Sequence, residues 1–116
     1  MNLEEIRNYC LNKRGATEST PFGDDTLVFK VANKMFLLMG LTSSETRFNV
    51  KCNPEIAIDL RERFDSVIPG YHMNKKHWNT IISSSELSDE FIKEQIDNSY
   101  SLIVLSLPKK IQTDLL

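Results

Sequence analysis

The sequence has only two cysteines and no long hydrophobic run, and each scarcity excludes a class of protein. Cys10 and Cys52 have neither CxxC spacing nor the density of a secreted disulfide scaffold, so we expect buried free thiols in a reducing cytoplasm. No apolar stretch is long enough to span a bilayer, and the first residues lack the basic start and apolar run of a signal peptide. We therefore expect a cytoplasmic protein without a membrane partner.

Patterns typical of catalysis or metal binding are also missing. His72 and His77 are five residues apart, whereas two zinc ligands on one helix face are four apart, and no nearby acid or thiol completes a site. No further oxygen ligand follows Asp24 and Asp25 at the spacing of a calcium loop. No serine lies in a glycine-flanked elbow, and nothing in the sequence activates either cysteine. We expect no enzymatic activity, no metal and no cofactor.

What is present is the composition of an ordinary globular domain. The 116 residues are 41% hydrophobic and 26% charged, which predicts one domain, 1–116, that folds without disulfides and acts as a monomer. The net charge of -2 is unevenly distributed, because residues 26–80 carry eight basic and five acidic side chains while both flanking segments are net acidic. The middle of the chain can therefore form a local anion-binding face, although the domain as a whole is not basic.

Hydrophobic periodicity predicts an α+β domain. Helices are expected over residues 2–13, from Asn53-Pro54 to about residue 65, and from Ser88 to Pro108, followed by a tail that forms a short helix or frays. Period-two alternation predicts strands over residues 26–31, 35–39, 48–52 and 78–82, after a short edge segment within residues 17–25. The first two strands form a hairpin, and the long last helix covers the sheet.

Three assignments of side chains to faces follow from these patterns. Met35, Leu37 and Met39 are expected on the sheet face that the helices leave uncovered. In the second helix, Ile56 is expected in the buried stripe, and Arg61 is expected to face water.

Several strings resemble the MmcQ/YjbR family over nearly the whole chain. The matching strings are Lys13–Ala16, Pro21–Gly23, Lys34–Phe36, Lys51–Pro54, Pro69–Thr80, Ser99–Tyr100 and Leu107–Lys110. The resemblance implies a frataxin-like (CyaY-like, YjbR-like) α+β fold, with helices packed on one face of an antiparallel sheet. It also implies a family of uncharacterised bacterial proteins for which a double-wing type of DNA binding has been suggested. Iron binding by analogy with frataxin would need a denser acidic ridge than Glu4, Glu5, Asp24 and Asp25 provide.

The stretch from Pro69 to Thr80 is the candidate site, since it holds both histidines, the only tryptophan and a lysine pair after a Pro-Gly turn. Cations beside flat aromatic rings are typical of nucleic-acid surfaces, and basic side chains of the neighbouring strands extend the patch to the sheet edge. The side chains assigned to this candidate interface are Lys30, Lys34, Arg47, Lys51, Tyr71, His72, Asn74, Lys75, Lys76, His77 and Trp78.

Two alternatives remain open for these residues. The stretch can be structural, with Trp78 anchoring the core, Tyr71 and His72 fixing the turn, and the lysines only keeping a surface loop soluble. The protein can also bind a protein or a small ligand on the uncovered sheet face, without any role for nucleic acid. The prediction is a non-enzymatic binding protein with DNA as the leading partner.

Overall fold

In the computed structural model, which describes residues 1–116, six antiparallel strands form one sheet in the order β1-β2-β3-β4-β6-β5. The strands are β1 (Ala16–Ser19), β2 (Thr26–Val31), β3 (Lys34–Gly40), β4 (Arg47–Lys51), β5 (Val67–Pro69) and β6 (Trp78–Ile82). The helices are α1 (Leu3–Leu11), α2 (Pro54–Arg63), α3 (Asp89–Leu105) and α4 (Lys109–Asp114). The antiparallel α+β architecture that the sequence predicts is confirmed.

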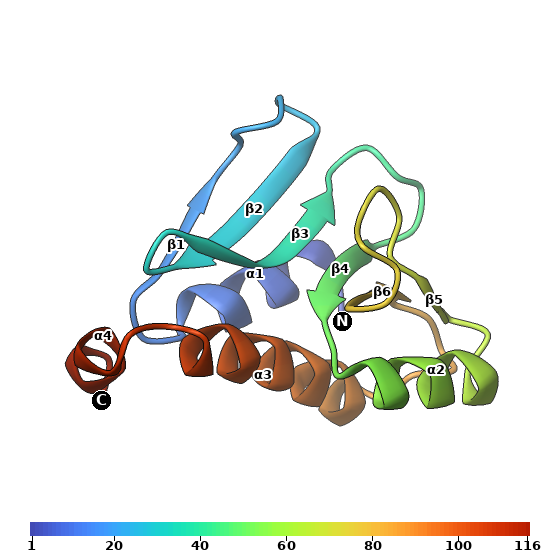
Figure 1. Cartoon of the computed structure of the whole chain (residues 1–116). Coiled ribbons are helices and arrows are strands. Elements are labelled where there is room, and N and C mark those ends of the chain that lie inside the picture. Colours follow the sequence, from blue (N-terminus) through green and yellow to red (C-terminus); the bar gives the residue numbers. More distant parts are fainter.

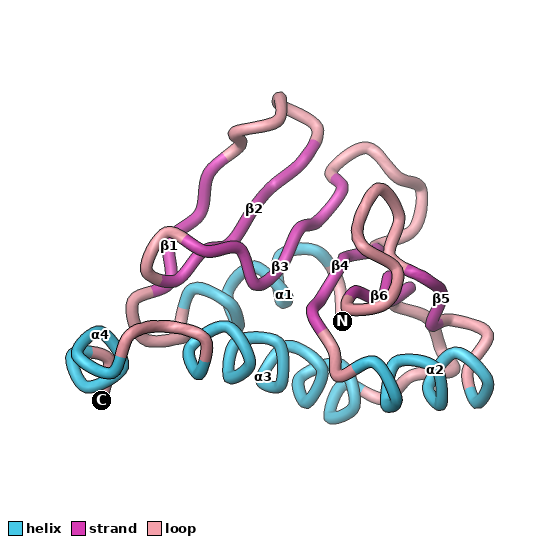
Figure 2. Tube along the Cα trace, in the orientation of Figure 1, coloured by secondary structure: helices cyan, strands magenta, loops and turns pink.

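The molecule has a helical layer and a sheet layer. Helices α2, α3 and α4 lie on one side of the strands, whereas the loops 20–25, 41–46 and 70–77 rise on the other side (Figures 1 and 2). The longest helix, α3, packs against the central strands β3 and β4, as expected for the main cover of the sheet. One face of the sheet is therefore covered by helices and the other is left to the loops.

Local sequence explains where the elements begin. The capping box predicted at the first helix is present, since the Asn2 side chain accepts a hydrogen bond from Glu5 N–H and the Glu5 side chain accepts one from Asn2 N–H. Asn53 caps α2 ahead of Pro54, and Ser88 caps α3. The strand that periodicity missed is β5, which has only three residues and is too short to show alternation.

A β-bulge decides which face of β3 is buried. The pairing of β2 with β3 shifts between Phe29 and Lys30, so Phe36 is an extra residue on β3. Phe36 and Leu37 therefore both enter the main core, and Met35 pairs with Lys30 on the opposite face.

The prediction that Leu37 and Met39 lie on the uncovered face is wrong, and only Met35 lies there. Cross-strand neighbours share a face, and Leu37 pairs with Phe29 while Met39 pairs with Leu27. Leu37 and Met39 are 0% exposed and belong to the core cluster that includes residues of α1, α2 and α3.

Helix α2 buries a narrower stripe than predicted. Ala57 and Leu60 are buried, but Ile56 is 53% exposed, so its assignment to the buried stripe is wrong. The helix packs near the end of the sheet, against the short β5 and β6, where only a thin stripe can reach the core.

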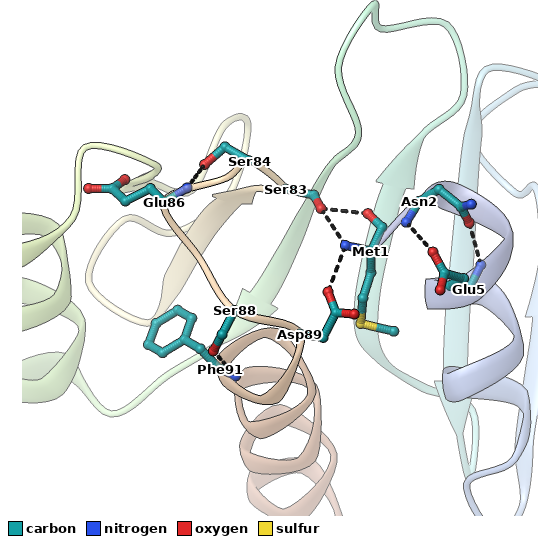
Figure 3. A network of polar contacts seen from close by, with 9 residues as sticks. All are labelled: Met1, Asn2, Glu5, Ser83, Ser84, Glu86, Ser88, Asp89 and Phe91. Atoms are coloured by element: carbon teal, nitrogen blue, oxygen red, sulfur yellow. Dashed lines mark hydrogen bonds and ion pairs between the residues drawn. The ribbon is translucent and has the colours of Figure 1, made fainter.

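A polar network joins the start of the chain to the start of α3 (Figure 3). The Met1 amino group donates to Ser83 Oγ and to Asp89 Oδ1 over 3.1 Å each, and the Ser83 hydroxyl donates back to Met1 O. These contacts tie α1, the end of β6 and α3 together.

None of the helices combines the length and the apolar character that crossing a membrane requires.

Candidate nucleic-acid interface

Loop 70–77 is a compact turn held by its own backbone. Gly70 N–H donates to Trp78 O over 2.9 Å, and Asn74 O accepts from His77 N–H (3.2 Å) and Trp78 N–H (3.0 Å). The Asn74 side chain accepts from Lys76 N–H over 2.9 Å, a local bond typical of asparagine in turns. Asn74, assigned above to the interface, therefore shapes the loop.

The same loop is anchored on the sheet through the backbone of Tyr71. Tyr71 N–H donates to Thr80 Oγ1 over 3.0 Å, and Asn49 Nδ2 donates to Tyr71 O over 3.1 Å. The Thr80 hydroxyl in turn donates to Asn49 Oδ1, so the two anchors form one network. The backbone of Tyr71 is fixed, while its ring is 65% exposed and lies 4.0 Å from the His72 ring between centroids.

Arg61 of α2 holds the loop from the helical side. Its Nε donates to Asn79 Oδ1 over 2.6 Å, and its Nη2 donates to Trp78 O over 3.2 Å and to Lys75 O. The expectation that Arg61 faces water is wrong, because its guanidinium supplies the donor that the Oδ1 of buried Asn79 requires. Arg61 follows the buried Ala57 by four residues, and this helical spacing was the signal that could have placed it on the sheet-facing side of α2.

The open face is the sheet surface opposite the helices. Its strands carry only cations, and the acids on this side are Asp24, Asp25 and Glu45 of the flanking loops. The face is formed by the outward side chains of Thr26, Val28, Lys30, Met35, Leu38, Arg47, Asn49, Lys51, Trp78 and Thr80. Strands β2, β3, β4 and β6 together with loop 70–77 carry six basic side chains and no acidic one. The four helices, in contrast, carry ten acidic and six basic side chains.

The structure brings most of the predicted interface residues to this face. Lys30, Arg47, Lys51 and Trp78 lie on β2, β4 and β6, which are interior strands, so they form part of a face and not of a sheet edge. Tyr71, His72, Lys75 and Lys76 are exposed on loop 70–77. Lys34 is exposed beside the Ala32–Asn33 turn, but it pairs with the buried Val31, so it lies on the helix-covered side of the sheet and does not belong to the open face. His77 is half-buried, with its carbonyl bonded to Cys52 N–H.

A cavity of about 730 Å³ opens on the open face. Its walls come from loops 20–25, 41–46 and 70–77, and Leu38, Met35 and Asn49 of the central strands lie beneath them. Sequence reasoning missed this cavity because three loops that are distant in sequence form it. The only signal was the pair of aromatic residues Phe22 and Tyr71, each in a turn where no core requires them.

Arg47 is the charged side chain of this cavity with unused bonding capacity. Its Nη2 forms an ion pair with Glu45, while its Nε is shielded from solvent and has no hydrogen-bond partner. A buried donor of this kind costs free energy until it finds an acceptor.

The two cysteine thiols are buried and unreactive. Burial raises the pKa of Cys10 to about 12 and also raises the pKa of Cys52, so neither is a thiolate at neutral pH. Both cysteines are free and buried, as predicted. No group of three histidine, cysteine or acidic side chains gathers as a metal site.

Comparison with known proteins gives a consistent family signal. A family model described as YjbR matches residues 11–102. An uncharacterized protein YjbR of Escherichia coli (strain K12) is 31% identical over 110 residues, 95% of this chain and 93% of its own length. An uncharacterized protein YbdF of Escherichia coli O157:H7 is 35% identical over 92 residues, 79% of this chain and 75% of its own length.

Solved structures agree with these relatives. The crystal structure of Deinococcus radiodurans protein DR2400, with a DUF419 domain, has a TM-score of 0.93 and 32% identity, covering 98% of this chain and 87% of that one. A Pseudomonas syringae crystal structure has a TM-score of 0.76 and 26% identity, covering 88% of this chain and 98% of that one. The overlap includes nearly the whole of both folds.

Proposed function

From the premise that this chain belongs to the YjbR family, we propose that it is a non-enzymatic protein that binds nucleic acid on its open face. The carrying observation is the segregation of charge between the two layers. Five cations lie on the open face and loop 70–77 of a chain whose net charge is -2, against three acids in the flanking loops. The cations are Lys30, Arg47, Lys51, Lys75 and Lys76, and the acids are Asp24, Asp25 and Glu45. A surface of this kind attracts phosphates locally even though the whole protein is weakly acidic.

The exposed aromatic side chains favour a single strand over a duplex. The Tyr71 ring is exposed beside the His72 ring, and the backbone of Tyr71 is held by Thr80 and Asn49, so the ring offers a stacking surface at a fixed place on the loop. Unpaired bases stack on such rings, whereas the bases of a duplex are already stacked on one another. DNA remains the leading partner, and the binding mode is phosphate contact by lysines with stacking of bases.

The test is anisotropy titration of labelled single-stranded and duplex DNA with wild-type protein and a Lys30→Ala/Lys76→Ala variant. Lys30 is half-buried on the open face and Lys76 is exposed on loop 70–77, and neither side chain bonds another residue, so the substitutions leave the fold intact. We expect wild-type binding that weakens steeply between about 50 and about 200 mM salt. The variant should bind more weakly. The slope of log binding constant against log salt concentration should be smaller in magnitude by about 1.4 on single strands, because each lost phosphate contact accounts for about 0.7.

The matched control is Lys109→Ala/Lys110→Ala, an adjacent exposed pair on α4 in the helical layer. It removes the same charge, so unchanged affinity there assigns the effect to the open face. Equal weakening by both pairs, or absence of binding at the lower salt, would contradict the proposal.

A second function is favoured by the cavity alone. Its volume of about 730 Å³ lies within the range of small-ligand sites, and apolar and polar groups both line it. In this function the protein binds a small organic molecule, and nucleic acid has no role. A ligand that raises the melting temperature while every oligonucleotide fails to bind would support it.

A further inference from the structure

The cavity on the open face has two exposed aromatic residues at its rim. Phe22 of loop 20–25 is 62% exposed and Tyr71 of loop 70–77 is 65% exposed, and both line the same cavity. These loops enter it from different strands and are separated by almost fifty residues of chain. Large exposed rings that no core explains mark a contact surface, and two of them at one opening suit a flat ligand.

The interior of the cavity suits a planar ring with polar edges. Leu38 and Met35 of β3 and Met73 of the loop provide apolar contact, and methionine adapts its shape to flat surfaces. Arg47 lines the cavity with its side chain 36% exposed, so its guanidinium offers donors to a ligand. Asp25 is the one acidic side chain among the lining residues, and a carboxylate accepts hydrogen bonds from an exocyclic amino group.

Nucleobases combine these properties, because each has flat faces and an edge of donors and acceptors. The lysines beside the cavity supply the charge that the attached phosphates require. Lys30 pairs with Met35 across β2 and β3, and Lys51 pairs with Trp78 across β4 and β6, so cations flank the central strands on the same face.

We propose that this cavity accepts an unpaired base of a nucleic-acid strand, with Tyr71 and Phe22 as stacking surfaces and the exposed part of the Arg47 guanidinium as the donor to the base edge. The inference rests on the proposed function and adds to it, because it assigns single-strand preference to a defined site. Phosphate contacts alone would not distinguish a strand with bases from one without them.

The test compares three probes of about 12 nucleotides, a length within the range that single-strand-binding folds cover. They are a mixed-sequence single strand, an abasic strand with the same phosphates, and a duplex. We expect the wild-type protein to bind the single strand at least about fivefold more tightly than the abasic strand, the lower end of base stacking on an aromatic ring. Free nucleoside monophosphate is a fourth probe.

Two variants act on the cavity without touching the core. Tyr71→Ala removes an exposed ring while the backbone bonds of residue 71 remain, and Thr42→Trp fills the cavity from an exposed loop position. Both should reduce the ratio of single-strand to abasic affinity to about one and leave abasic binding unchanged. Ser44→Trp is the matched control, since Ser44 is exposed on the same loop but does not line the cavity.

The outcomes separate the inference from the proposed function. Equal, salt-dependent binding of the single and abasic strands would overturn the base pocket and keep nucleic-acid binding by the open face. Loss of the ratio in Ser44→Trp as well would also overturn it. Monophosphate binding as tight as strand binding would assign the cavity to a free nucleotide instead, and no binding of any probe would overturn both proposals.

Discussion

Ser99 shows how one side chain completes the sheet from the helical layer. Beyond the pair Leu37 and Val50, β3 and β4 separate, and the buried Ser99 hydroxyl of α3 lies between them. It accepts from Lys51 N–H over 2.9 Å and donates to Phe36 O over 2.6 Å. The hydroxyl thus replaces a ladder bond that the strands no longer make directly, and it fixes α3 to the sheet.

Ser99→Ala should therefore be costly for so small a change. It leaves the Lys51 N–H and the Phe36 C=O without a partner in a buried place, so we expect a loss of about 2–4 kcal/mol of unfolding free energy. Urea denaturation followed by circular dichroism measures it. Ser101→Ala, exposed on the same helix, should change stability by less than about 0.5 kcal/mol, and an equal effect of the two would contradict the role of Ser99.

Glu86 gives the protein a pH-dependent contact. The backbone N–H groups of Ser66 and Asp65 donate to its two carboxylate oxygens over 2.8 and 3.2 Å. Hydrogen bonding lowers the pKa of Glu86 below its ordinary value, first from the Ser66 side chain and then from the backbone N–H groups of Ser66 and Asp65. A carboxyl group with a lowered folded pKa stabilises the protein above its unfolded pKa, and this stabilisation is lost as pH falls through the folded pKa.

Glu86→Gln should therefore destabilise the protein at pH 7, because the amide loses the charge and accepts through only one atom. The difference from wild type should shrink as pH falls through the lowered folded pKa of Glu86, where the wild-type carboxyl also becomes neutral. Denaturation midpoints at several pH values measure this. Glu94→Gln, an exposed carboxylate of α3 without a hydrogen bond, is the control, and a difference independent of pH would refute the linkage.

At the scale of the element, loop 70–77 depends on close approach of its two ends. A Cβ on Gly70 would lie 2.8 Å from Trp78 Cβ and 2.9 Å from Trp78 O. Gly70 is therefore required because β6 passes directly over it, and not because of a special backbone angle.

Gly70→Ala should displace the loop and cost about 1–3 kcal/mol, as overpacking does in a tight site. Gly40→Ala is the matched control, since a Cβ there meets nothing within 4 Å. Thermal melts of both variants, with the exchange rate of the Trp78 and His77 amides, test the expectation. Similar melting temperatures for the two variants would contradict this expectation, because they would show that the loop accommodates the added methyl group without loss of stability.

The elements show where sequence is informative and where it is not. Capping residues and periodicity predicted α1, α2, α3 and four strands, because those signals act within a few residues. The faces of β3 and the position of Arg61 depend on pairing with distant segments, since the bulge at Phe36 and the partner Asn79 are set by tertiary contact. For the same reason the basic residues and Tyr71 could be named from the sequence, but the cavity beside them could not.

For the whole molecule, the segregation of charge makes the protein an electric dipole with a weak net charge. The helical layer is net acidic, and the strands and loop of the open face are basic. We expect the wild-type protein to be retained on a cation exchanger at pH 7 and low salt despite its net charge of -2.

Lys30→Glu/Lys76→Glu should abolish this retention, and Lys109→Glu/Lys110→Glu, with the same change in net charge, should preserve most of it. Elution salt concentrations compare the two directly. If both variants elute together, net charge and not its arrangement controls the interaction.

The contacts of Arg61 also make helix and loop one cooperative unit. Because a single guanidinium from α2 bonds Asn79 and the carbonyls of Trp78 and Lys75, opening the loop costs the helix its partner as well. Any ligand that tightens loop 70–77 therefore lowers the opening frequency of α2, on a surface that the ligand never touches. By reciprocity, a partner seated on α2 would raise the affinity of the opposite face.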